Sequence, residues 1–168
     1  EEINSDIQKE FTYDDFKWQW DNQIKIDFAK RAEGLHKVLY QCPKCKTEYK
    51  MTSKDDKLTC THCNKTWTMG EYGRISGEDG ETEFAHIPDW YEWERENVRN
   101  EIELGEDSFC CDVRVDSLPN AKKFINLGKA KLTHNMQGFL LEGEYNGESY
   151  SVKKSVPSMY SCHIEYEY

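Results

Sequence analysis

Residues 42–63 read CPKCKTEYKMTSKDDKLTCTHC and contain two Cys-x-x-Cys pairs, Cys42 with Cys45 and Cys60 with Cys63, separated by 14 residues. Each pair can form a tight turn, so four thiolates can converge on one tetrahedral zinc ion. The 14-residue interval is just short of the usual roughly 15–20 residues, but it still allows a hairpin between the two turns. The pattern therefore predicts a zinc ribbon with these four cysteines as ligands.

A site of four cysteines limits the chemistry that can take place there. If the protein supplies all four ligands, no coordination position remains for a catalytic water, so the predicted zinc is structural. Two alternatives stay open: the cysteines could be disulfides or free thiols, and His62, inside the second pair, could replace a cysteine as ligand. The seven cysteines are an odd number, and paired Cys-x-x-Cys motifs are typical of metal binding in a reducing compartment.

The composition is that of a folded, acidic protein. The 168 residues carry a formal net charge of −10 and include 13% aromatic residues. No apolar run approaches the roughly 18 residues of a membrane-spanning helix, and the start, EEINSDIQKEF, lacks the basic and apolar parts of a signal peptide. We therefore expect a cytoplasmic protein. Because the chain starts without Met and ends at CHIEYEY within an alternating pattern, we also expect a piece of a longer protein.

Charge is distributed unevenly along the chain. Residues 36–75 contain eight Lys and Arg against four Asp and Glu, a net charge of +4, whereas residues 76–112 contain two basic against 13 acidic residues, a net charge of −11. Nucleic-acid phosphates are bound by clustered basic side chains. Only the predicted ribbon is therefore a candidate for binding nucleic acid, with Tyr49 and Trp67 available to stack on bases.

The N-terminal half is predicted to contain three segments. Residues 1–35 form a helical segment, because apolar side chains recur every four residues at Ile3, Ile7 and Phe11. Residues 36–75 form the zinc ribbon. The sequence SGEDGETE then opens an acidic linker, residues 76–87.

A single amphipathic helix is predicted after the linker. Pro88 suits the first turn of a helix, and Gly105 is a natural C-terminal cap after Leu104. The side predicted to be buried comprises Trp90, Trp93, Val98 and Ile102. The residues predicted to be mostly solvated are Glu92, Glu94, Glu96, Glu101 and Glu103.

From Ser108 onward the apolar pattern changes to a period of two, which is typical of half-buried strands. Strands are predicted from Phe109 and over 128–133, 138–145, 148–154 and 160–168, and Asn146-Gly147 is a strong hairpin signal. Residues 88–168 are thus predicted to form a helix plus an antiparallel β domain, cut short at its end. The fold class is α+β: an N-terminal helical segment, a small zinc ribbon, one amphipathic helix and a C-terminal antiparallel β-meander.

The remaining reactive side chains suggest no active site. Cys111 and Cys162 fall on the inward faces of their strands and are predicted to be core residues, whereas Cys110 faces outward without an assigned role. His86 stands near Asp89 and could belong to a ligand surface, but a helix that packs its tryptophans is the simpler interpretation. We predict no catalytic residue and no cofactor besides Zn²⁺.

Three blocks of the sequence resemble a known family. They are RAEGLHKVLYQCPKC (31–45), GETEFAHIPDWYEWER (80–95) and VRVDSLPNAKKFI (113–125), the last followed by GKAKLTH (128–134). They are similar to the zinc-ribbon-containing C-terminal extension of bacterial proteins similar to 1-acyl-sn-glycerol-3-phosphate acyltransferase. The resemblance covers nearly all of the chain and implies that residues 1–35 are the tail of an upstream catalytic domain.

The catalytic signature of that family is a His followed by four residues and an Asp, in which the His acts as general base. The chain has five His residues, and none is followed by an Asp at that distance. The residues found there are Gln41, Trp67, Tyr91, Phe139 and Tyr168. The resemblance therefore implies that the catalytic residues belong to the parent protein and that this chain has none.

The sequence suggests two alternative functions. The first is a non-catalytic, zinc-binding accessory or regulatory module of a lysophospholipid (1-acyl-glycerol-3-phosphate) acyltransferase. Its partners would be the upstream domain and another protein, and it would reach the inner face of the membrane only through the parent protein. The second is a zinc-ribbon module that binds nucleic acid or protein, although the net charge of −10 weighs against nucleic acid. An enzyme in its own right would need a polar cleft with perturbed titratable groups.

Overall fold

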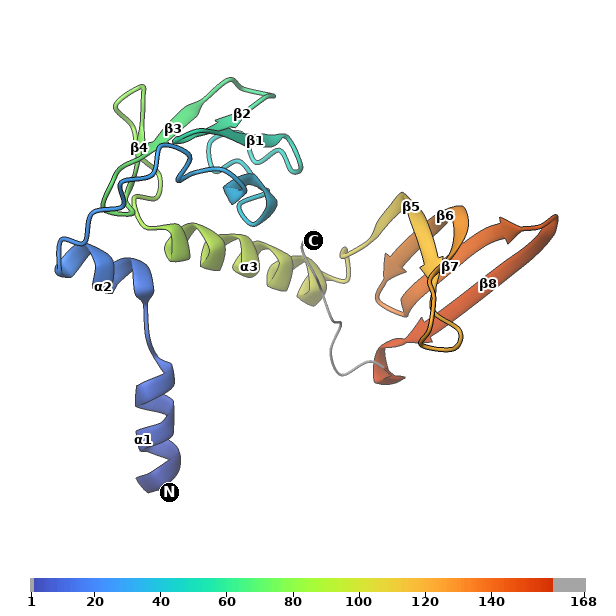
Figure 1. The fold of residues 1–168 in the computed structure, drawn as a ribbon. Coiled ribbons are helices and arrows are strands. Elements are labelled where there is room, and N and C mark those ends of the chain that lie inside the picture. The colour runs from blue at the N-terminus through green and yellow to red at the C-terminus, as the bar shows by residue number, and fades with distance from the viewer. Residues whose placement is uncertain (1, 159–168) are drawn as a thin grey trace. The chain divides into compact units, whose positions relative to one another are not determined.

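The computed structural model of the protein describes residues 2–158 and divides into two units, Glu1–Asn97 and Val98–Tyr168 (Figure 1). Each unit contains a four-stranded antiparallel sheet, and helices account for much of the remaining regular structure. The predicted α+β class is confirmed.

The first unit is built around a small sheet whose strands follow one another in sequence, in the order β1-β2-β3-β4. Its helices are α1 (Glu2–Phe11), α2 (Asp15–Asp21), a short 3-10 helix (Leu35–Lys37) and the start of α3 (Ile87–Leu104); its strands are β1 (Met51–Lys54), β2 (Lys57–Cys60), β3 (Thr66–Met69) and β4 (Ile75–Gly77). The β1–β2 hairpin lies between the two Cys-x-x-Cys pairs, as the spacing predicts, and Met51 pairs with Cys60 at its open end.

The core of this unit lies between the sheet and α3. Trp67 of β3 and Trp90 of α3 are both fully buried, and their ring centroids lie 5.0 Å apart at an interplanar angle of 60°. Such an edge-on contact between two large rings buries much apolar surface in a small domain. The other buried apolar residues of this core are Ala32, Leu39, Cys42, Met51, Leu58, Cys60, Met69, Ile75 and Ile87.

Residues 76–87, predicted to be an acidic linker, belong to the ribbon. Ile75–Gly77 forms β4 and pairs with β3, with Ser76 opposite Thr68. Beyond β4, the Nε1–H of Trp67 donates to Glu83 Oε2 at 2.9 Å. The acidic side chains are compatible with this packing because ribbon lysines pair with them, a compensation that composition does not reveal.

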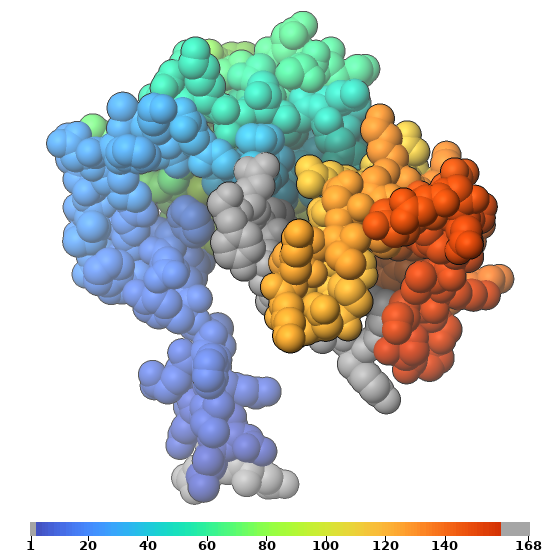
Figure 2. Space-filling model, turned by 45° about the vertical axis from the view of Figure 1, so that its right-hand side comes forward, coloured from blue at the N-terminus to red at the C-terminus, as the bar shows by residue number. Residues whose placement is uncertain are grey.

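The N-terminal segment, residues 1–35, is helical only in part. Asp14 caps α2 by accepting a hydrogen bond from the Lys17 N–H at 2.8 Å, but the helix ends at Asp21. Residues 22–34 contain no helix or strand. They lie against the ribbon (Figure 2).

Backbone contacts hold residues 22–34 against the ribbon. The Ile26 N–H donates to Glu71 O at 2.8 Å, and Arg31 Nε donates to Met69 O at 2.5 Å. These partners lie more than 30 residues away in sequence, which explains why neither helical nor alternating periodicity describes the segment.

Helix α3 begins and ends close to the predicted positions, and Gly105 follows it with a φ of +72°. Trp90 is buried as predicted, whereas Ile102 is exposed. Glu94, predicted to be solvated, is instead only 1% exposed. This prediction was wrong because Glu94 Oε1 accepts a hydrogen bond from the backbone N–H of Gln41, a partner that the periodicity of the helix cannot indicate.

The second unit is a four-stranded antiparallel meander in the order β5-β6-β7-β8. Its strands are β5 (Phe109–Ser117), β6 (Ile125–Asn135), β7 (Gly138–Tyr145) and β8 (Glu148–Ser155), followed by a short 3-10 helix (Val156–Ser158). The Asn146-Gly147 hairpin turn is confirmed by positive φ values of 54° and 82°. Cys111 is exposed, so its predicted place in a core was wrong. The strand predicted over 160–168 lies outside the described residues.

Gly73 offers a test of how the N-terminal segment packs on the ribbon. Its φ is +77°, and a Cβ there would lie 2.7 Å from Oε1 of Gln19, a buried side chain whose amide donates to Ile24 O. We expect Gly73→Ala to lower the free energy of unfolding by about 2–3 kcal/mol, from backbone strain and displacement of Gln19 together. Gly80→Ala is the control: its φ is +86° but no atom lies within 4 Å, so chemical denaturation should show a loss of only about 1 kcal/mol. Equal losses would contradict the packing of Gln19.

Glu94 offers a test by pH. Burial raises the pKa of Glu94 to about 7 from its ordinary value of 4.5, against the opposing effect of the Gln41 N–H. The stabilisation from this proton is therefore complete below about pH 4.5 and lost as the pH rises through 7. We expect the wild type to lose about 2–3 kcal/mol of unfolding free energy relative to Glu94→Gln between about pH 5 and about pH 8. The pH dependence of metal binding cancels in this difference, and a difference that stays constant across the range would refute the assignment.

Candidate metal centre

The four predicted ligands Cys42, Cys45, Cys60 and Cys63 meet at the open end of the β1–β2 hairpin. Their sulfur atoms all lie within 4.8 Å of one another. The Sγ atoms of Cys42 and Cys63 are 3.7 Å apart, as are those of Cys45 and Cys60. Among residues 2–158, this is the only cluster of side chains whose ligand atoms are arranged to share a metal ion.

The first Cys-x-x-Cys turn, or knuckle, is shaped by two backbone hydrogen bonds. Cys42 O accepts from the Lys46 N–H at 2.8 Å, and the Cys42 N–H donates to Thr47 O at 3.0 Å. Together they close the backbone around the two sulfur atoms. The chain then continues into β1.

The second knuckle repeats the geometry of the first. Cys60 O accepts from the Asn64 N–H at 2.8 Å, and the Cys60 N–H donates to Lys65 O at 2.9 Å, at the same four- and five-residue offsets. The residue after each knuckle is left-handed, with a φ of 62° at Lys46 and 60° at Asn64. Sequence reasoning missed both positions. Asn64 carried a signal, because Asn tolerates this conformation better than other non-glycine residues, but Lys46 carried none.

The sulfur positions fit a tetrahedral ion. Metal–sulfur bonds of about 2.3 Å in a regular tetrahedron place the sulfur atoms about 3.8 Å apart. Two of the six sulfur–sulfur separations, 3.7 Å each, agree with this edge, and the other four are no longer than 4.8 Å. A disulfide would require about 2.05 Å, so these sulfur atoms are not paired in disulfides. Of the alternatives left open by the sequence, the geometry favours a metal site.

When no cation is bound, the thiols of the cluster have different pKa values. Burial raises the pKa of Cys42 and of Cys63. Burial also acts to raise the pKa of Cys45, but hydrogen bonds with the side chain and backbone of Thr47 outweigh it and lower that pKa to about 5. Four adjacent thiolates repel one another, so complete deprotonation requires a divalent cation among them, and binding would release protons.

His62 is not among the clustered ligands. Its Nδ1 lies 3.2 Å from Thr47 Oγ1, and Thr47 Oγ1 lies 3.4 Å from Cys45 Sγ. The histidine therefore reaches the centre through a hydroxyl group rather than as a replacement for a cysteine. Groups that contact ligands in this way help to orient them.

Three lysines of the ribbon are paired with acidic side chains. Lys65, although its side chain is almost fully buried, places Nζ 2.8 Å from Glu83 and 3.1 Å from Asp79. The other pairs are Lys44 with Asp79 at 3.4 Å and Lys57 with Glu78 at 2.5 Å. Residues 78–83 thus pair with three of the eight basic side chains of residues 36–75.

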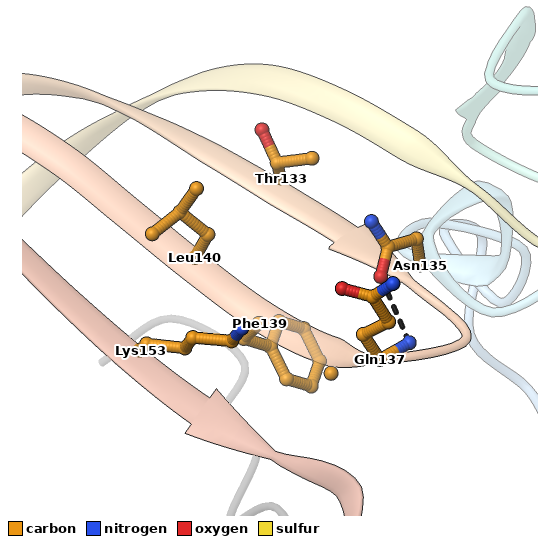
Figure 3. A pocket seen from close by; sticks show the side chains of 7 residues that line it. Thr133, Asn135, Gln137, Phe139, Leu140 and Lys153 are labelled. Carbon is orange, nitrogen blue, oxygen red and sulfur yellow. Dashed lines mark hydrogen bonds between the residues drawn. The ribbon is translucent and has the colours of Figure 1, made fainter.

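A small pocket in the second unit has no catalytic arrangement. It lies beside the β6–β7 turn and has a volume of about 90 Å³ (Figure 3). Asn135 is occupied by the turn, because its Oδ1 accepts from the Gln137 N–H at 2.8 Å. Lys153, Phe139 and Leu140 complete most of the lining. None of these side chains forms a nucleophile–base pair.

His86 pairs with Asp14, before α2, and not with Asp89 of α3. Its Nε2 lies 2.6 Å from Asp14 Oδ2, and its ring packs edge-on against Phe16. The pair joins the start of α3 to α2, and the contact with His86 helps to lower the pKa of Asp14 against the raising effect of burial. This arrangement fits the packing role predicted for the segment.

The chain matches no known protein family, no curated protein sequence and no solved structure. The resemblance to the acyltransferase extension therefore stays a prediction. Within residues 2–158, none of the helices combines the length and apolar character needed to cross a membrane.

Asn64 offers a test of the knuckle geometry. Alanine disfavours the left-handed conformation that this position requires, whereas glycine accepts it. We expect Asn64→Ala to lower the unfolding free energy of the metal-loaded protein by about 1 kcal/mol and Asn64→Gly to leave it within about 0.5 kcal/mol of the wild type. Equal losses in the two variants, measured by chemical denaturation, would show that the asparagine side chain matters rather than the backbone.

Proposed function

We propose that Cys42, Cys45, Cys60 and Cys63 bind one Zn²⁺ and that this ion is structural. The sulfur separations of 3.7 Å, which match a tetrahedron of about 2.3 Å bonds, carry the proposal. All four positions come from protein thiolates, so the ion has no free position at which a substrate or water could bind.

Zinc fits the site better than other metals. Four thiolates in a tetrahedron are typical of zinc or of iron. Zn²⁺ has no geometric preference of its own and does not react with oxygen, so it suits a site whose purpose is to hold two turns together. Iron bound to the same sulfur atoms is the main competing outcome and would give a coloured protein.

The structural role is supported by the place of the site in the core. Cys42 and Cys60 are fully buried and belong to the same cluster of side chains as Trp67 and Trp90. The sheet of this unit has short strands of three or four residues, which bury little surface by themselves. A bound ion would therefore supply a large part of the folding free energy, on the order of 10 kcal/mol by analogy with zinc fingers.

At the level of biology, we propose that the chain is a non-catalytic accessory or regulatory module of an acyltransferase that acts on a lysophospholipid. The support is the resemblance of residues 31–45, 80–95 and 113–134 to the extension of such proteins. The parent reading frame tests this proposal. An upstream domain with a His-x-x-x-x-Asp motif is expected, and an upstream domain of another class would overturn it.

Two observations weigh against nucleic acid as a partner. Trp67, a candidate for stacking on bases, is fully buried, and Lys44, Lys57 and Lys65 are paired with acidic side chains. Tyr49 is 75% exposed, but its ring is already stacked on Tyr40, with the ring centroids 5.1 Å apart, and the protein is acidic overall. A docking role toward protein is the better-supported alternative.

The metal proposal predicts a specific pattern of unfolding. Protein produced with zinc should contain one zinc per chain by elemental analysis. Cys60→Ser, or excess chelator, should lose the metal and unfold residues 36–97, because about 10 kcal/mol of binding free energy is lost. The amide signals of β5–β8 should persist, since that sheet belongs to the other unit.

Cys110→Ser is the matched control, because this exposed cysteine lies in β5 outside the cluster. It should keep one zinc per chain and the wild-type spectrum. The proposal fails if the wild type binds no metal and the knuckles remain ordered, or if Cys60→Ser and Cys110→Ser behave alike. Bound iron in place of zinc would overturn the assignment of the ion but not of its ligands.

A further inference from the structure

The backbone just before the first metal ligand is held by α3. The N–H of Gln41 donates to Glu94 Oε1 at 2.8 Å, and the carbonyl of Gln41 accepts from Trp90 Nε1–H at 3.0 Å. Both backbone polar groups of the residue that precedes Cys42 are therefore bound by side chains of one helix. The peptide N–H of Cys42 donates to Thr47 inside the knuckle, so the Gln41–Cys42 peptide is fixed on both sides.

Both helical side chains are suited to hold a backbone rigidly. Trp90 and Glu94 are spaced by four residues and so lie on the same face of α3, where they reach the two sides of Gln41. Trp90 is fully buried and Glu94 is 1% exposed. A third contact extends the arrangement, because Asn97 Nδ2 donates to the side-chain Oε1 of Gln41 at 2.5 Å.

The second knuckle is held by the sheet and does not require side chains of a helix to fix its backbone. Thr59, which precedes Cys60, lies in β2 between two strands, opposite Thr52 of β1 and Thr66 of β3. Gln41 occupies the equivalent place before Cys42 but belongs to no strand and forms only an isolated bridge with Glu48. The two knuckles thus have the same internal geometry and different external support.

We propose that Glu94 and Trp90 are positioning residues of the metal centre: they take the place of neighbouring strands, fix the Gln41–Cys42 backbone and so keep the Cys42 sulfur at its tetrahedral position. This inference rests on the proposed metal binding. The inference predicts an effect on the rate of zinc release. If the first knuckle can open, the Cys42 sulfur can leave the metal, and the ion then dissociates more easily.

The test is the rate at which the zinc-loaded full chain transfers its ion to an excess of chromophoric chelator. Glu94→Leu removes the acceptor of the Gln41 N–H and should speed transfer about tenfold or more, the equivalent of one lost hydrogen bond of about 1.5 kcal/mol. Glu94→Gln keeps a carbonyl acceptor at the same place and should transfer zinc within about threefold of the wild type. Glu92→Leu, at an exposed position of the same helix, is the control and should match the wild type.

Amide hydrogen exchange separates positioning from a general loss of stability. In Glu94→Leu the Gln41 amide should exchange about tenfold faster or more, while the amide of Leu58, in the middle of the sheet, stays near the wild-type rate. Trp90→Phe keeps an aromatic ring but removes the Nε1–H donor. It should also speed zinc transfer, and it provides a second variant if Glu94→Leu folds poorly.

The inference is overturned if Glu94→Leu and Trp90→Phe release zinc at the wild-type rate. It is also overturned if the amides of Gln41 and Leu58 accelerate together, since the effect would then be a general destabilisation. Zinc content of the wild type distinguishes the two proposals. A chain that binds no zinc refutes the metal centre itself, whereas one zinc per chain with unchanged release in the variants refutes only the role of α3.

Discussion

The first unit is organised around four cysteine sulfur atoms that all lie within 4.8 Å of one another. Each knuckle supplies two of them, in a unit whose strands are short and whose turns contain left-handed residues at Lys46 and Asn64. Thiolates packed this closely repel one another unless a cation lies between them. The proposed ion would thus convert an unfavourable cluster into a strong link between the two knuckles.

The elements around the centre can be understood as the support that this cluster requires. The sheet carries the second knuckle, and α3 carries the first through Trp90 and Glu94, which hold Gln41. Trp90 also packs on Trp67. One side chain therefore belongs both to the apolar core and to the hydrogen bonds that hold Gln41. The acidic residues 78–83 pair with ribbon lysines and turn a stretch that looks like a linker into part of the domain.

Local patterns predicted much of this arrangement. Cysteine spacing identified the four clustered residues and the hairpin between them, Pro88 and Gly105 marked the ends of α3, and Asn146-Gly147 marked a hairpin. In each case the signal and the structure that it specifies lie within a few residues of each other, so no knowledge of the tertiary fold is needed.

The remainder depends on contacts between distant parts of the chain. Glu94 lies four residues after Trp90, on the same face of α3, but a charged side chain is expected to be solvated, and its burial depends on Gln41, 53 residues away. The path of residues 22–34 is set by Arg31 and its partner Met69, 38 residues away. Charge counts along the sequence suggested a basic ribbon followed by an acidic linker. In the folded chain, acidic side chains of residues 78–83 pair with lysines of residues 36–75.

X-ray absorption at the zinc edge measures the coordination of the proposed ion. A saturated four-cysteine centre should give a first shell of four sulfur atoms at about 2.3 Å, with no nitrogen or oxygen ligand. A shell of three sulfur atoms and one nitrogen would instead place His62 at the metal. A shell that includes a water oxygen would reveal an open position, and either result would contradict a saturated, structural four-cysteine centre.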